Sequence, residues 1–171
     1  PKSKLKFTQS DERIEISVPK TAPDPILSII VLEIDGEPQV YPIPSQGKVV
    51  QVSSVDSASC PYNLVDGDPA NQWKAAPGEV TSIIDIDLED EVSISNISLI
   101  EPWRTWHGNS QEIVLQVQEE GEWVEVVSDK TSGAGYSMEF GPVSGRYFRL
   151  TITGPKGKEP VLNEVVLNRA I

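Results

Sequence analysis

Apolar and polar residues alternate one by one along three segments of the chain, residues 82–88, 112–118 and 146–153. A period of two places all the apolar side chains on one face of a strand. It is typical of antiparallel sheets that pack one face on a core and leave the other in water. The predicted inward residues are Ile84, Ile86, Leu88, Ile113, Leu115, Val117, Phe148, Leu150 and Ile152. The predicted outward residues are Asp85, Asp87, Gln116, Gln118, Arg149 and Thr151.

Gly, Pro, Asn and Asp separate these segments, and the periodicity of amphipathic helices is nearly absent. Within residues 92–100 the alternation changes phase at Asn96, which predicts a β-bulge or bend. The whole pattern predicts an all-β fold, an antiparallel β-sandwich.

The first 45 or so residues differ from the rest of the chain. Residues 12–18 and 27–34 are rich in Ile, Val and Leu and predict two strands, which a connection with three prolines joins. The turn-rich, Pro-rich stretch 35–47 predicts a linker, and we place the domain boundary near Gln46. Because two or three strands alone are marginally stable, we expect this part to pair with the second domain or with another domain.

The charge balance limits the partners. Acidic residues number 26 and basic residues 14, which gives a net charge of -12. Such a charge repels phosphate backbones and anionic lipid surfaces but suits neutral ligands and cations. No apolar run is long enough to cross a bilayer. We therefore expect no nucleic-acid partner and no membrane insertion.

Cysteine chemistry contributes little to the prediction. Cys60 is the only cysteine, so one chain can form neither a disulfide framework nor a cysteine-based zinc site. We expect Cys60 to be a small residue near the end of a strand.

An acidic turn at residues 66–68 is the candidate metal site. Calcium binds six to eight hard oxygen atoms and accepts backbone carbonyls as readily as carboxylates. Asp66 and Asp68 offer carboxylates and Asn71 an amide oxygen. The spacing does not fit an EF-hand. The alternative is an ordinary Asp-Gly turn that needs no metal.

The segment 101–110 is the candidate ligand-binding loop, because it holds two of the four tryptophans and the only histidine. An aromatic ring stacks on the apolar face of a sugar, while Arg, His and Asn bind its hydroxyl groups. In the alternative interpretation, one Trp caps the sandwich and the histidine is structural. The candidate sugar-binding residues are Trp103, Arg104, Trp106, His107, Asn109 and, from a later loop, Tyr136.

The remaining tryptophans and arginines are predicted to be structural. We assign Trp73 and Trp123 to the core and expect Arg146 and Arg149 to be surface or ion-paired residues. Catalysis is not expected. A glycosidase needs two carboxylates across a pocket, and only Glu101 lies in a pocket-like segment.

Residues 47–171 resemble discoidin domains, also called coagulation factor 5/8 C-terminal-like domains, and within them carbohydrate-binding module family 32. The motifs that carry the resemblance are NLVDGDPANQW, IIDIDL, GEWVEVV, SGRYFRLTIT and LNEVVL, in the order of that family. The resemblance implies a jelly-roll sandwich of the galactose-binding-domain-like type, often with one structural Ca²⁺, and sugar recognition by loops at one end.

The same resemblance implies one further calcium ligand, and the comparison with it argues against galactose specificity. Glu164 in LNEVVL matches the glutamate that closes the calcium shell in that family, whereas Asn71 stands where the family often has Thr or Ser. In galactose-binding relatives His and an aromatic residue lie on an early loop, and Arg and Asn on a later one. Here Arg104 precedes His107 in the same loop, so galactose specificity does not carry over.

Residues 4–34 resemble the C-terminal β-domain of bacterial glycoside hydrolase family 29 α-L-fucosidases, through the bend VPKTAPDPI and the strand IVLEIDG. This implies that residues 1–46 are the tail of that β-domain plus a linker, and that the catalytic barrel lies elsewhere. We expect a secreted or periplasmic, non-catalytic carbohydrate-binding module that holds its parent enzyme near fucosylated or galactosylated glycans. The alternatives are a structural or protein-docking β-sandwich without sugar binding, and a tail that contributes a loop to the parent active site.

Overall fold

A computed structural model describes residues 4–9, 14–24, 26–36, 42–102, 110–131 and 135–170 of the chain. These residues form two compact units, with the division before Pro42. No helix among them is long and apolar enough to cross a membrane.

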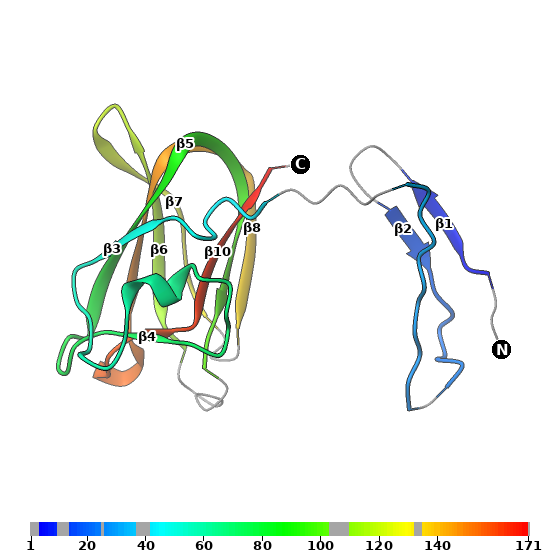
Figure 1. The fold of residues 1–171 in the computed structure, drawn as a ribbon, viewed down its shortest axis with the longest axis horizontal. Coiled ribbons are helices and arrows are strands. Elements are labelled where there is room, and N and C mark those ends of the chain that lie inside the picture. Colours follow the sequence, from blue (N-terminus) through cyan, green and yellow to red (C-terminus); the bar gives the residue numbers. More distant parts are fainter. Residues whose placement is uncertain are drawn as a thin grey trace. The chain divides into compact units, whose positions relative to one another are not determined.

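The first unit contains one antiparallel pair of strands, β1 (Lys6–Gln9) and β2 (Ile14–Ser17), drawn in blue in Figure 1. The predicted strand at 27–34 is not part of any sheet in the described chain, so that prediction is wrong for this structure. Its apolar side chains are largely exposed, with Ile29 at 74% and Val31 at 75%. A strand needs a neighbouring backbone to satisfy its N–H and C=O groups, and none of the described strands pairs with residues 27–34.

The second unit is built from antiparallel strands, and this confirms the predicted all-β sandwich (Figure 1). Its main sheet has the order β10-β5-β8-β6-β7, and β3 also pairs with β5. Two short strands, β4 and β9, form a separate pair. The strands are β3 (Val49–Val52), β4 (Trp73–Lys74), β5 (Thr81–Ile100), β6 (Glu112–Glu119), β7 (Glu122–Lys130), β8 (Tyr136–Thr153), β9 (Val161–Leu162) and β10 (Glu164–Arg169). The described helices are the short 3-10 turns η1 (Pro61–Leu64) and η3 (Pro155–Gly157).

Strands β5 and β8 run through both layers of the sandwich. The first half of β5 pairs with β3, and its second half pairs with β10. Between these halves the register with β8 shifts from Asp87 to Val92, and again from Ile94 to Asn96. Such irregularities bend a strand, so one hydrogen-bonded sheet curls over into two layers (Figure 1). The second shift confirms the break predicted at Asn96.

The core lies between the layers and consists of the inward residues of the alternating strands. All nine predicted inward residues are buried. Trp73 is also fully buried, as predicted, and its indole N–H donates to the carbonyl of Ser54 at 3.2 Å. The described residues of this cluster all belong to the second unit.

The prediction that Trp123 belongs to the core is wrong. Trp123 is half-buried, and the guanidinium carbon of Arg149 lies 4.1 Å from the centre of its ring. Arg149 is held there by two hydrogen bonds to Asp85, at 2.7 and 2.8 Å. Arg146 makes the same bidentate contact with Asp87, so both arginines are ion-paired as predicted.

Candidate functional site

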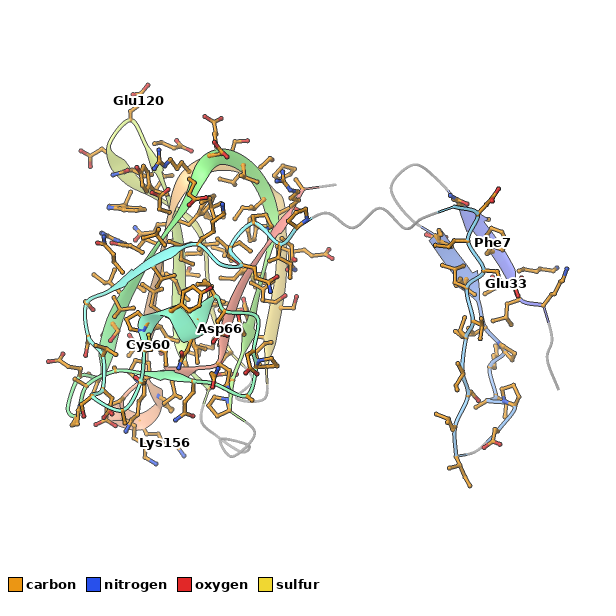
Figure 2. All side chains as sticks on the ribbon, in the orientation of Figure 1. Phe7, Glu33, Cys60, Asp66, Glu120 and Lys156 are labelled. Carbon is orange, nitrogen blue, oxygen red and sulfur yellow. The ribbon has the colours of Figure 1, made fainter. Side chains whose placement is uncertain are left out.

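The acidic turn between η1 and β4 is held together by its own side chains (Asp66 in Figure 2). Asp66 accepts a hydrogen bond from the backbone N–H of Asp68 at 2.8 Å. Asp68 in turn accepts one from the N–H of Ala70 at 2.9 Å. The amide of Asn71 donates to both carboxylates, at 3.1 and 3.2 Å. The turn therefore brings three of the four predicted metal ligands together.

Glu164, the fourth predicted ligand, comes to this turn from the start of β10. It is only 4% exposed, and its Oε1 has no hydrogen-bond partner among the described residues. Burial and the neighbouring Asp66 carboxyl raise the pKa of Glu164 to about 7. Burial acts to raise the pKa of Asp66 too, but hydrogen bonds from Asp68 and Asn71 outweigh it and the pKa is lowered. A buried carboxyl oxygen that has no partner among the described residues, next to the Asp66 carboxylate, is a place where positive charge is stabilised.

The turn offers carboxylate and amide oxygen atoms, the hard kind of ligand that calcium prefers. Within the described ranges, no three Asp, Glu, His or Cys side chains gather closely enough to hold a metal by themselves. An ion would therefore also use amide and backbone carbonyl oxygens, which calcium accepts and zinc does not favour. Asn163, beside Glu164, also has a buried side-chain oxygen, for which the described residues offer no partner. Its amide nitrogen donates to the carbonyl of Pro69 at 2.8 Å.

The predicted sugar-binding loop is only partly described. Its candidate residues Trp103, Arg104, Trp106, His107 and Asn109 lie outside the described residues, so their assignment stays a prediction.

Tyr136, the last predicted sugar-binding residue, starts β8, is half-buried and packs against the core. Its hydroxyl donates to Asp129 at 3.1 Å, and burial together with Asp129 raises its pKa to about 12. The hydroxyl is therefore protonated at physiological pH and already has a partner.

A buried carboxylate network joins the ends of the two segments that contain the candidate loops. Glu101 is 5% exposed, and its Oε1 accepts hydrogen bonds from Thr131 at 2.7 Å and from Gln111 at 2.9 Å. Its Oε2 accepts one from the backbone N–H of Gly135 at 3.2 Å. Glu101 and Gln111 bracket the first segment, and Thr131 and Gly135 bracket the second. We call these four residues the Glu101 clamp.

The sequence analysis missed this clamp. It identified Glu101 as an acidic residue in a pocket-like segment, but its partners lie 10, 30 and 34 positions away along the chain. Gln111 extends the network to β9, because its side chain makes two hydrogen bonds with the backbone of Val161, both at 3.0 Å. A polar residue directly after an apolar strand is too common a signal to predict such a network.

An antiparallel sandwich with an acidic turn at its surface, and with two segment ends joined by one buried carboxylate, defines a β-sandwich domain. Residues 49–165 match the F5/8 type C domain family. The chain belongs to the F5/8 type C domain family, as the resemblance to discoidin domains implied. A search of curated proteins finds no significant match.

Several solved structures share this fold. A pectin-binding carbohydrate-binding module is 27% identical, with a TM-score of 0.63 over 74% of this chain and 94% of that chain. The crystal structure of SpGH29 is 21% identical, with a TM-score of 0.67 over 76% of this chain and 28% of that one. A GH29 fucosidase from Ruminococcus gnavus in complex with fucose is 23% identical, with a TM-score of 0.62 over 73% and 26%. The chain thus spans less than a third of the length of these two GH29 chains.

Proposed function

We propose that residues 47–171 form a non-catalytic carbohydrate-binding module that binds glycans through the two segments joined by the Glu101 clamp. The observation that carries this proposal is the clamp itself. One buried carboxylate accepts hydrogen bonds from residues that bracket both segments, so both start and finish at the same place in the sandwich. In this proposal the aromatic and polar side chains of residues 103–109 and Tyr136 form one binding site.

The chemistry of these residues favours a neutral sugar. Tryptophan rings stack on apolar C–H faces, and Arg, His and Asn provide directed hydrogen bonds to hydroxyl groups. A net charge of -12 disfavours strongly anionic ligands. The similarity to a pectin-binding module at 27% identity supports glycan binding as the general activity. Fucosylated or galactosylated glycans are the proposed ligands.

The proposed role of the module is to keep a parent enzyme near its substrate. Residues 4–34 resemble the C-terminal β-domain of GH29 α-L-fucosidases, and two GH29 chains contain a similar fold. In this proposal the chain is part of a longer, secreted or periplasmic exoglycosidase. Binding to a glycan would then raise the effective substrate concentration at the catalytic domain.

One structural Ca²⁺ completes the proposal. Asp66, Asp68, Asn71 and Glu164 would hold it, because they supply oxygen ligands. One of these oxygens, Oε1 of Glu164, is buried and has no partner in the described part of the chain. When bound, the ion supplies positive charge to the carboxylates and does not take part in a reaction. Calcium should therefore raise the melting temperature of chelator-treated protein by mass action. An unchanged melting temperature at millimolar calcium would contradict this part of the proposal.

The glycan proposal is tested by binding measurements on Trp103→Ala and Trp106→Ala, with Tyr147→Ala as the matched control. Tyr147 is an exposed aromatic residue on β8, outside the clamped segments. Loss of a stacking ring should weaken binding about tenfold, which corresponds to about 1.4 kcal/mol. Unchanged affinity in both Trp variants would show that this loop is not the sugar site. If folded wild-type protein binds no glycan at all, the structural or protein-docking alternative holds instead.

A further inference from the structure

The residues that lead into the sandwich, 43–47, lie against both the acidic turn and the last strand. We call them the leading segment. The Ser45 hydroxyl is buried, donates to the carbonyl of Val165 at 3.0 Å and accepts from the N–H of Leu167 at 3.0 Å. The N–H of Gly47 donates to the carbonyl of Val65 at 2.7 Å, just before the acidic turn. Hydrogen bonds thus fix this segment to parts of the chain that are distant in sequence.

Gln46, between these two anchors, extends its side chain onto the acidic turn. A Cβ atom placed on Gly67 would lie 2.1 Å from Nε2 of Gln46 and 3.1 Å from its Cδ. The amide group of Gln46 therefore rests directly on the backbone between Asp66 and Asp68. Glycine is required at position 67 for this approach, and also because its φ of +79° lies in the left-handed region.

A cavity of about 160 Å³ lies at this junction. Its walls come from the leading segment, the acidic turn, the end of β5 and β10. Ser45, Gln46 and Glu164 are the polar side chains of this lining, and the other lining side chains are apolar. Glu164 is the buried side chain whose Oε1 has no partner among the described residues. The volume is sufficient for an ion and several water molecules, since a water in the liquid occupies about 30 Å³.

We propose that Gln46 is a ligand of the calcium ion at the acidic turn, and that the ion joins the leading segment, the turn and β10. This inference rests on the proposed calcium site. Calcium takes six to eight oxygens, so the four side chains predicted from the sequence leave positions to fill. A half-turn of the Gln46 amide puts Oε1 where Nε2 now lies, and the side chain then presents an oxygen without any backbone movement.

Calorimetric calcium titration of the full chain tests this assignment with three variants. Gln46→Met keeps the length of the side chain but removes its oxygen, and it should weaken calcium binding about tenfold. Gln46→Glu supplies a charged oxygen and should bind calcium at least as tightly as the wild type. Gln51→Met, which changes an exposed glutamine on β3, should leave the affinity unchanged.

A second readout separates a ligand from a merely structural residue. Calcium should slow hydrogen exchange at the N–H of Gly47 in the wild type and much less in Gln46→Met. The melting temperatures of these two proteins in EDTA should agree within about 2 °C, because the Gln46 oxygen acts only when the ion is present.

The two proposals fail in different ways. If Glu164→Gln abolishes calcium binding but Gln46→Met binds like the wild type, the Gln46 assignment is wrong and the calcium site remains. If the wild type binds no calcium, the calcium site is wrong and the Gln46 assignment falls with it.

Discussion

Two apolar segments of this chain, residues 29–34 and 83–88, have similar composition, but the first is exposed and the second is largely buried. In β5, Ile84 and Ile86 are buried, because β3 and β8 pair with the strand on its two sides. In the first unit, Ile29 and Val31 are about three-quarters exposed, and no described strand pairs with the segment. The comparison shows that β-propensity becomes structure only where neighbouring strands provide hydrogen bonds and a face to pack on.

The largest expected change in the free energy of unfolding comes from truncating a core side chain of the second unit. Trp73→Ala should lower the free energy of unfolding by about 3–5 kcal/mol, because a fully buried indole leaves a cavity. Ile29→Ala should change it by less than about 0.5 kcal/mol, because that side chain is mostly in solvent. Urea denaturation of both variants measures the difference. Equal losses would mean that residues 29–34 are packed as tightly as the core.

The Glu101 clamp should give the next largest effect. Glu101→Ala removes the buried acceptor of three hydrogen bonds. It should lower the free energy of unfolding by about 2–4 kcal/mol. Glu101→Gln keeps the shape of the side chain and some of its hydrogen bonds, so it should lower the free energy of unfolding by about 1 kcal/mol. Glu112→Gln is the control, because that residue is exposed and makes only a surface ion pair with Lys130. If Glu101→Ala is as mild as the control, the clamp does not hold the loop ends.

Breaking the ion pair between Asp87 and Arg146 should lower the free energy of unfolding by a smaller amount that depends on pH. The hydrogen bond from Arg146 lowers the pKa of Asp87, although burial opposes this. A lowered pKa in the folded state stabilises above the unfolded value of about 3.9, and the contribution is lost as pH falls through the folded value. Asp87→Asn should therefore lose less than about 1 kcal/mol at pH 7, because the pair is partly exposed.

Urea unfolding of Asp87→Asn and wild type between pH 2 and pH 7 checks the sign of this effect. The difference between the two proteins should shrink as the pH falls below about 4. A difference that grows towards low pH would contradict the role of the ion pair.

Removing the first unit should change the stability of the sandwich least of all. The core residues that the structure describes all come from the second unit, so residues 42–171 should melt within about 2 °C of the full chain. Differential scanning calorimetry of the two proteins makes the comparison. A large loss of stability would mean that the sandwich depends on residues 1–41.

Local patterns in the sequence predicted the parts of this molecule that depend on nearby residues. The alternation identified the inward residues of β5, β6 and β8, and the phase change at Asn96 identified the bulge. The acidic turn was predictable because Asp66, Asp68 and Asn71 lie within six positions. Glu164, almost a hundred residues later, was identified only through the resemblance to a known family.

Features that depend on distant residues were missed. The Glu101 clamp joins strand ends 10 to 34 positions apart, and no periodicity marks its partners. Trp123 was assigned to the core as a residue that opens a strand, but Arg149 from another strand covers its ring instead. Residues 27–34 have the composition of a strand, and composition does not reveal whether a pairing partner is present.

The proposed glycan recognition is tested most directly by a glycan array with the purified full chain, run once with calcium and once with EDTA. The account predicts binding to fucosylated or galactosylated glycans in calcium and a weaker signal in EDTA, where the acidic turn loses its ion. A blank array in calcium, from protein shown by circular dichroism to be folded, would contradict the assignment of this domain as a carbohydrate-binding module.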